Sequence, residues 1–211
     1  SHSASRLQRG FVSGRQLITN IVELDTYART LGLIHSNLTH LLAFLDFAAA
    51  CPSVSHSWLH LVLFYAKVPT GLRDYIKLLY NSNTAFSNID GAHELLFPIL
   101  AGVLQGCPLS GFLFAMAIDH FLRQLETTIE ARGLGFVRAC ADDIGVTLHD
   151  ITDLFTLKTT FDDAKRLANL TLKPSKCVII PTAHVLTPTL SATLSDWLYH
   201  NLPDWADFAI K

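Results

Sequence analysis

Short apolar runs alternate with amphipathic stretches along the chain, and this pattern predicts strands and helices in mixed order. Residues 38–47 (LTHLLAFLDF) form an apolar run that ends at a carboxylate, which is typical of a buried strand. The stretches 55–66 and 71–80 have helical spacing. The other predicted elements are a hairpin over 84–99, a turn at 104–110, a helix over 111–132, a hairpin of 134–140 and 144–148, a helix over 151–168 and a strand at 177–180. This order predicts an α+β fold in which helices back an antiparallel sheet.

Composition narrows the class of protein. The 211 residues are 50% hydrophobic and 16% charged, which excludes disorder, coiled coil and collagen and predicts one domain with a real core. Four widely spaced cysteines with no CxxC form neither a disulfide framework nor a zinc finger, and they indicate a reducing intracellular compartment. A net charge of −2 gives no support for nucleic-acid binding.

One stretch is long enough to raise the question of a membrane span. The mean hydropathy of the chain is +0.32, and Leu95 to Ile118 carry no charge. However, Pro98, Gly102 and Pro108 would break a helix within this stretch and leave backbone groups unpaired in lipid. The stretch therefore predicts a buried strand, turn and helix, and no membrane contact is expected. The first ten residues lack the apolar region of a signal peptide.

Three aspartates lie next to apolar segments, where a charged side chain is unusual. Asp142 and Asp143 are adjacent and lie between apolar segments, whereas Asp162 and Asp163 sit on an amphipathic helix and indicate a solvated face. At about 4 Å, two like charges repel by roughly 4 kcal/mol at an effective dielectric near 20, so a cation would stabilise the pair. Asp46, at the end of its apolar run, is the natural third ligand, with a cap on the following loop as the alternative. Three carboxylates can hold two hard cations, Mg²⁺ or Mn²⁺, in the arrangement used for phosphoryl transfer.

Five segments resemble the motifs of reverse transcriptases. LDFAAACPSV resembles the first catalytic motif of that family, CADDIGV its metal-binding hairpin, and AGVLQGCPLSGFLFAMAID its GxxQGxPLSPxLF segment. QRGFVSGRQLITNI is similar to the QxGFxxGRxxxxN stretch of non-LTR retrotransposon and group II intron-type enzymes, and LTLKPSKC to the lysine-bearing GLxLNxxKT. The motifs follow the family's order over residues 8–177. The wording DFAAACPSV within the first catalytic motif is most similar to that of non-LTR retrotransposons.

The resemblance implies a fold and an activity. The fold would be a polymerase palm with a ferredoxin-like core: part of the fingers in 1–37, the palm in 38–186, and a tail, 187–211, leading towards a primer grip and thumb that the chain lacks. The activity would be that of a retroelement's RNA-directed DNA polymerase domain, transferring nucleotides by a two-metal mechanism. The implied cofactor is Mg²⁺ or Mn²⁺. The implied partners are an RNA template, a DNA primer, deoxynucleoside triphosphates and further domains of a longer polyprotein, located in the nucleus for a eukaryotic element.

The resemblance also assigns residues. It places the metal ligands and catalytic acids at three positions and a lysine near the pyrophosphate leaving group; these are Asp46, Asp142, Asp143 and Lys176. It places template, nucleotide or phosphate contacts at four further positions, which are Cys51, Gly102, Gln105 and Arg15. Glycine at position 102 allows a close backbone approach, and the Gln105 amide both donates and accepts hydrogen bonds.

Four residues depart from the family pattern. Cys51 replaces an aromatic residue that excludes the ribose 2′-hydroxyl, Cys140 replaces Tyr or Phe, Gly111 replaces Pro and Lys173 replaces Asn. These departures leave open a decayed copy that keeps the fold without the activity.

A second alternative is a metal-dependent phosphohydrolase that uses the same three acids. The Gly102–Gln105 turn argues against it, because a hydrolase has no use for a template-facing segment. His56 and His60 have the spacing of a zinc pair on one helix, but the sequence offers no nearby third ligand, and surface or core histidines are the favoured interpretation.

Overall fold

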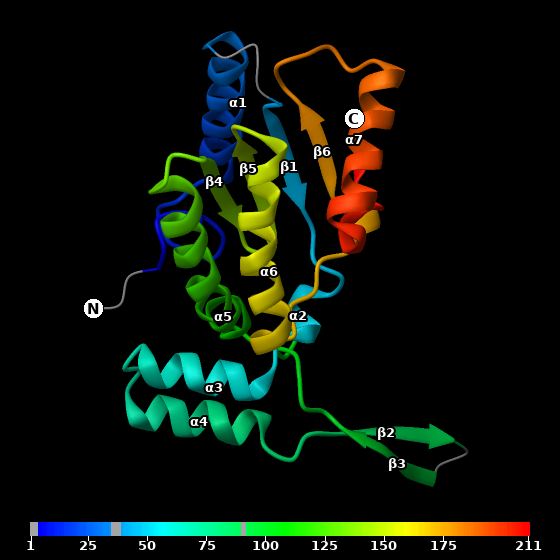
Figure 1. Ribbon diagram of the computed structural model, residues 1–211. Helices are drawn as coiled ribbons and strands as arrows, with labels where there is room; N and C mark the ends of the chain where they lie inside the picture. The colour runs from blue at the N-terminus through cyan, green and yellow to red at the C-terminus, as the bar shows by residue number, and fades with distance from the viewer. Residues whose placement is uncertain (1–3, 35–38, 90–91) are drawn as a thin grey trace.

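A five-stranded sheet forms the centre of the molecule in the computed structural model, which describes residues 4–34, 39–89 and 92–211 (Figure 1). Its strands are β1 (Leu41–Leu45), β4 (Gly135–Cys140), β5 (Asp143–Leu148), β6 (Val178–Pro181) and β7 (Ala209–Ile210), in the order β4-β5-β1-β6-β7. Neighbouring strands are antiparallel except β6 and β7, which are parallel. The predicted strand at 38–47, the hairpin about Asp142-Asp143 and the strand near 177–180 are therefore confirmed.

The connections between the strands give the sheet its ferredoxin-like core. The chain runs from β1 through helices to the β4–β5 hairpin, then through one helix to β6. This is the βαββαβ arrangement, with β1 central between β5 and β6. The predicted α+β palm fold with an antiparallel sheet backed by helices is confirmed.

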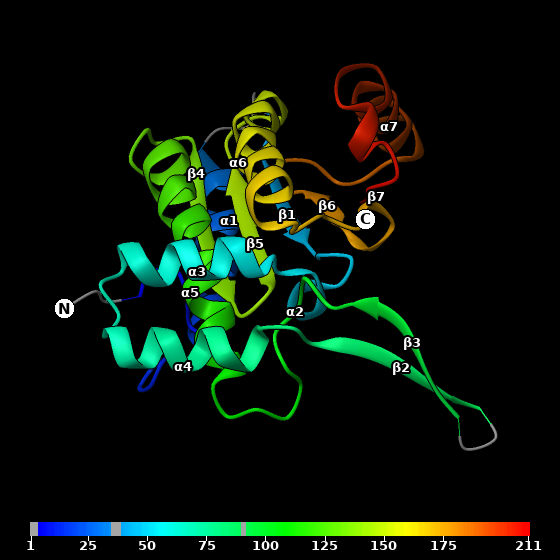
Figure 2. The same ribbon diagram turned by 90° about the horizontal axis from the view of Figure 1, so that it is seen from below.

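The described part of the chain contains seven α-helices. They are α1 (Leu17–Ile34), α2 (Ala50–Ser53), α3 (His56–Tyr65), α4 (Thr70–Tyr80), α5 (Ser110–Leu125), α6 (Leu154–Ala168) and α7 (Pro188–Asn201). Helices α5 and α6 lie together on one face, whereas α1 packs against β4 and β5 from the other (Figures 1 and 2). A π-helical turn at Glu126–Glu130 continues α5, so the predicted helix over 111–132 changes pitch near its end.

Alternate residues of β1 point to the face of the sheet that α5 and α6 cover, although all five residues of this strand are apolar. Leu41, Ala43 and Leu45 of β1 are fully buried, whereas Leu42 and Phe44 point to the α1 side and remain partly accessible. A short 3-10 turn, Ile151–Asp153, leads into α6. A capping box fixes this turn, and in it the Asp150 side chain accepts from the Thr152 backbone N–H. The strand that leads to Asp46 therefore rests on a well-packed apolar layer.

A helical pair and a hairpin project from one end of the sheet (Figure 2). Helices α3 and α4 confirm the two predicted helices, and Ser55 caps α3 by accepting from the Trp58 backbone N–H. The hairpin of β2 (Thr84–Ile89) and β3 (Ala92–Pro98) confirms the prediction over 84–99, while its predicted turn, Asp90-Gly91, lies outside the described residues.

Both ends of the chain join the sheet. Gln8 forms a parallel bridge with Ala139 at the β4 edge. The tail, which the sequence leaves without a pattern, forms α7 and then β7, which extends the sheet beyond β6. The boundaries of the fingers, palm and tail stay predictions.

In the part of the chain that the structure describes, no helix has both the length and the apolar character needed to cross a membrane.

Candidate active site

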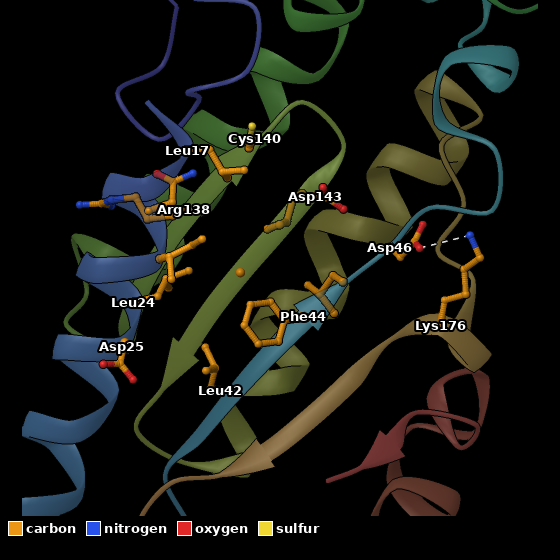
Figure 3. Close-up of a pocket in the computed structure, with 15 residues that line it drawn as sticks. Leu17, Leu24, Asp25, Leu42, Phe44, Asp46, Arg138, Cys140, Asp143 and Lys176 are labelled. Atoms are coloured by element: carbon orange, nitrogen blue, oxygen red, sulfur yellow. Dashed lines mark ion pairs between the residues drawn. The ribbon is translucent and has the colours of Figure 1, made fainter. Parts of the chain in front are cut away.

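Two of the three predicted acids meet where neighbouring strands end. Asp46 follows the last residue of β1, and Asp143 is the first residue of β5. Because Leu45 pairs with Ile144 in the antiparallel ladder, Asp46 comes next to Asp143 in register. Figure 3 shows both carboxylates at the same end of the two strands.

The third acid lies in the tight turn of the β4–β5 hairpin. The last pair of this ladder joins Cys140 to Asp143, which leaves Ala141 and Asp142 as the turn. Ala141 has a φ of 56°, in the left-handed region that only glycine adopts freely. The hairpin thus presents Asp142 and Asp143 in succession beside Asp46.

The electrostatics of these groups show a concentration of negative charge. Desolvation, followed by the charges of Asp142 and Asp46, raises the pKa of Asp143. Burial and the charge of Asp142 raise the pKa of the Cys51 thiol, and burial and both hairpin acids do the same for Cys140. Such a cluster suits a cation by its charge and its hard oxygen donors. Across the described ranges, no three side chains of the kinds that bind metals are yet gathered closely enough to hold an ion.

The raised pKa of Asp143 predicts how stability depends on pH. A carboxyl whose pKa is higher in the folded protein than in the unfolded chain favours folding when protonated, and this contribution is lost as pH rises through the folded pKa. Asp143→Asn is therefore expected to raise Tm at neutral pH in EDTA, and the gain should vanish as pH falls towards the carboxyl's ordinary range. Thermal melts from pH 4 to 8 measure this.

Asp163 provides a control of opposite sign. Hydrogen bonds from Arg166 and Gln124 lower its pKa, so Asp163→Asn should lower Tm at neutral pH and have no effect in acid. Equal Tm changes for the two variants at all pH values would contradict this account of the cluster.

The lysine of the last motif contacts the first acid directly. Lys176 Nζ lies 3.3 Å from Asp46 Oδ2, and both side chains are partly exposed (Figure 3). The backbone fixes this pairing, because the Lys173 N–H donates to the Asp46 carbonyl at 2.8 Å and the Asp46 N–H donates to Cys177 Sγ at 3.4 Å. The loop that bears Lys176 is thereby held to the end of β1.

The Gly102 segment is joined to the turn that carries Cys51. Gly102 has a φ of 97°, and a Cβ there would lie 2.8 Å from the Pro52 carbonyl oxygen. The Val103 N–H donates to the Cys51 carbonyl at 2.9 Å, and His56 Nε2 donates to the Gly102 carbonyl at 2.9 Å. His56 therefore bonds to the Gly102 segment and packs against Tyr80, which agrees with the predicted core histidine.

The structure gives two predicted site residues, Gln105 and Arg15, surroundings that do not include the three acids. Gln105 is exposed in the turn before α5. The Arg15 guanidinium donates to the carbonyls of Ser5, Gln8 and Ala4, so it organises the N-terminal loop, and a phosphate contact for it stays a prediction. Phe11 packs its ring where a Cβ at Gly111 would stand, 2.6 Å from Phe11 Cδ1, which accounts for the glycine there.

A groove of about 460 Å³ runs from the acids along the α1 side of the sheet (Figure 3). Its floor is apolar, with Leu42 and Phe44 of β1 facing Leu24 of α1. Asp46, Asp143 and Lys176 line it near the ends of β1 and β5, and Arg138 and Asp25 line its α1 side. The groove therefore combines an apolar floor with charged groups of both signs.

Gln8 and Gly10 are functional candidates that the motif comparison left without a role. Gln8 is fully buried and bonds to both backbone groups of Ala141. A Cβ at Gly10 would lie 2.1 Å from the Ala141 nitrogen, so only glycine fits. The QRGF string was the available signal, but its partner lies more than 130 residues away, and no local pattern identifies it.

Comparison with known families decides between the classes of enzyme. Residues 2–190 match the family described as reverse transcriptase (RNA-dependent DNA polymerase). The chain belongs to this family. Its relatives include the Pol polyprotein of the R2 retrotransposable element of Bradysia coprophila, 44% identical over 85 residues, which are 40% of this chain and 10% of that protein. The R2DM polyprotein of Drosophila melanogaster is 29% identical over 179 residues, which are 82% of this chain and 16% of that protein.

These relatives make the chain a reverse transcriptase domain of the non-LTR retrotransposon kind, and it spans only a small part of their length. Among solved structures, apo telomerase from Candida tropicalis truncated from its C-terminal domain has a TM-score of 0.65 at 14% identity, covering 86% of this chain and 37% of that one. This likeness shows that the reverse transcriptase domain has the polymerase palm fold.

Proposed function

We propose that this reverse transcriptase domain copies an RNA template into DNA by extending a DNA primer with deoxynucleoside triphosphates. The observation that carries the proposal is the placement of Asp46, Asp142 and Asp143 at one end of neighbouring strands, with Lys176 paired to Asp46. All four side chains that the chemistry needs are present, which supports an active domain over a decayed copy.

We propose that the three carboxylates draw together around a pair of divalent cations, Mg²⁺ or Mn²⁺, since the described residues do not yet gather them closely enough to hold an ion. Hard oxygen donors and the mutual repulsion that raises the pKa of Asp143 both favour them. Bound cations would supply the electrostatic stabilisation of the attacking and leaving oxygens in phosphoryl transfer. The family in general uses divalent metal ions.

The chain's own residues perform the remaining tasks. Lys176 is placed to exchange its partner Asp46 for the pyrophosphate leaving group, to which its ammonium would give a hydrogen bond or a proton. Cys51 and Gly102, joined by their backbones, would form the wall for the incoming sugar, and exposed Gln105 would contact the template. The apolar floor of the groove offers a surface to sugars and bases.

Primer extension tests the proposal. With poly(rA)/oligo(dT), dTTP and Mn²⁺ or Mg²⁺ at low salt, the chain should add nucleotides in a way that requires the template and stops with EDTA. Phosphate release from nucleotides without a template would favour the phosphohydrolase instead. Absence of both reactions in a folded chain would overturn the proposal and favour the decayed copy.

Weak binding of nucleic acid by the isolated chain is a second expectation. The chain has 16 basic and 18 acidic residues, and within the described ranges at least eight of the basic side chains are paired with acids. Because phosphate neutralisation dominates such affinity, a labelled RNA/DNA hybrid should bind only weakly at about 150 mM salt, and more tightly as salt falls. Fluorescence anisotropy measures this, and nanomolar binding at that salt would contradict it.

Cys51 predicts poor discrimination between sugars. A thiol is much smaller than the aromatic ring usual at this position, so Cys51→Phe should raise the preference for deoxynucleotides by about 10-fold, equivalent to roughly 1.4 kcal/mol. The measurement is the ratio of dTTP to UTP incorporation. Cys140→Phe restores an aromatic beside the hairpin acids and is the matched control, for which this ratio should stay unchanged. The same ratio in wild type and Cys51→Phe would refute the role of Cys51.

A further inference from the structure

The Gln8 amide is bound to the turn of the acidic hairpin. Its Oε1 accepts from the Ala141 N–H at 2.8 Å and from the Gly10 N–H at 2.7 Å, and its Nε2 donates to the Ala141 carbonyl at 3.1 Å. The side chain is fully buried. The amide therefore contacts both peptide planes that flank Ala141, and the second of these contains the nitrogen of Asp142.

The surroundings keep Gln8 in this place. The Arg9 N–H donates to the Ala139 carbonyl at 2.9 Å, and the Ala139 N–H donates to the Leu7 carbonyl at 3.0 Å. This short parallel bridge runs along β4 up to the turn, where the strand ladder ends. The Gln8 side chain then supplies the hydrogen bonds that a further strand residue would have made.

The turn needs such support. Ala141 has a φ of 56°, in the left-handed region that is unfavourable for a residue with a Cβ. Hydrogen bonds to both backbone groups of Ala141 oppose its return to the ordinary conformation.

We propose that Gln8 is a positioning residue for the catalytic hairpin: its buried amide holds Ala141 in the left-handed conformation and so sets the direction of Asp142. This inference rests on the proposed function. Gln8 touches no substrate and acts only through the turn, while Gly10 permits the close approach because it has no Cβ.

Gln8→Met tests the contact itself, because methionine has nearly the same volume and no amide. In hydrogen-exchange NMR of the chain, the Ala141 amide should exchange at least about 10-fold faster in this variant, since it loses the Gln8 Oε1 that accepts its hydrogen bond. The Ala139 amide, bound to the Leu7 carbonyl, should stay protected. Unchanged exchange at Ala141 would overturn the proposal.

Kinetics separate positioning from stability. Gln8→Met should lower kcat for primer extension by about 100-fold, the effect of a small displacement at a reacting centre, with the KM for dTTP changed by less than about threefold. Asp119→Ala is the control: Asp119 is buried in α5, where its carboxylate accepts from the Ser5 N–H of the same N-terminal segment and from Arg123 Nε. It should lower Tm by loosening this segment at Ser5 and leave kcat within about threefold, because the Gln8 amide that supports the turn is kept.

Rescue supplies the last test. In Gln8→Met/Ala141→Gly, glycine adopts the left-handed conformation without strain, so kcat should recover at least about 10-fold relative to Gln8→Met. No recovery, or an equal loss of kcat in Asp119→Ala, would show that Gln8 only stabilises the fold, and the proposal would be wrong.

A readout without catalysis distinguishes this inference from the proposed function. Mn²⁺ should broaden the Asp142 and Asp143 amide signals of the wild-type chain, and Gln8→Met should require about 10-fold more Mn²⁺ because its carboxylates are less well placed. If wild type binds Mn²⁺ but extends no primer, the proposed function fails while the positioning of Asp142 stands. If wild type does neither, Gln8 serves no catalytic site and the inference fails with it.

Discussion

Primer extension should disappear when Asp46 or Asp142 is replaced by asparagine. Each change removes a carboxylate from the three-acid cluster while keeping the shape of the side chain. The loss should reach about 1000-fold or more, equivalent to roughly 4 kcal/mol of transition-state stabilisation. The fold should remain, and without metal Tm should stay the same or rise, because the variant relieves the repulsion that raises the pKa of Asp143.

Asp162→Asn is the matched control for these variants. Asp162 lies on α6, where it is exposed and paired with Lys158, so its loss should change extension by no more than about twofold, as expected for a surface ion pair. The measurements are primer extension and thermal melts on the same samples. Near-normal extension by Asp46→Asn or Asp142→Asn would show that the carboxylates are wrongly assigned.

Gly102→Ala should cause a large loss of stability, because it combines a strained backbone with a close contact. A φ of 97° excludes an unstrained alanine, and the new Cβ would lie 2.8 Å from the Pro52 carbonyl oxygen. The two effects together should cost about 3 kcal/mol or more. Urea unfolding measures the change, which should appear as a lower midpoint with an unchanged slope.

Two other glycines separate the conformational cost of Gly102→Ala from its steric cost. Gly106 has a φ of 82° with no atom near its missing Cβ, so Gly106→Ala should show only the conformational cost, about 1 kcal/mol. Gly71 lies in α4 with open space and no positive φ, so Gly71→Ala should stabilise the helix by up to about 1 kcal/mol. A Gly102→Ala change no larger than that of Gly106→Ala would mean that the approach to Pro52 is not tight.

Sequence predicts the strands around the candidate site well, because their signals are local. Asp46 ends an apolar run, and the hairpin acids lie between two short apolar segments, so these runs identify the strands that bring Asp46 and Asp143 to neighbouring positions. Motif order then supplies Lys176, whose contact with Asp46 depends on backbone pairing of the last loop with the end of β1.

The sequence does not predict features that lack a local pattern or depend on residues far away in the chain. Helix α1 has no clear amphipathic pattern, because the apolar side chains of Ile18, Val22 and Leu33 are exposed on the side opposite the buried Leu24 and Leu31. The tail forms a strand of two residues, too short for any periodicity to show. Gln8 carries a motif position, yet its contact with the Ala141 carbonyl joins residues 133 positions apart and leaves no local pattern. Arg15 contacts carbonyls of its own loop, whose irregular backbone has no periodicity to read.

The contact between Gln8 and Ala141 also bears on the order of events during folding. It joins residues 133 positions apart, so the chain must close a very long loop before the acidic hairpin acquires its support. At about 5–20 residues per second, the ribosome needs on the order of 10 s to make that intervening chain, and the N-terminal segment waits unpaired for that time. The hairpin of β4 and β5 can form by itself as a local structure, and the segment docks onto it afterwards. Catalytic competence would then be among the last properties that the nascent chain gains.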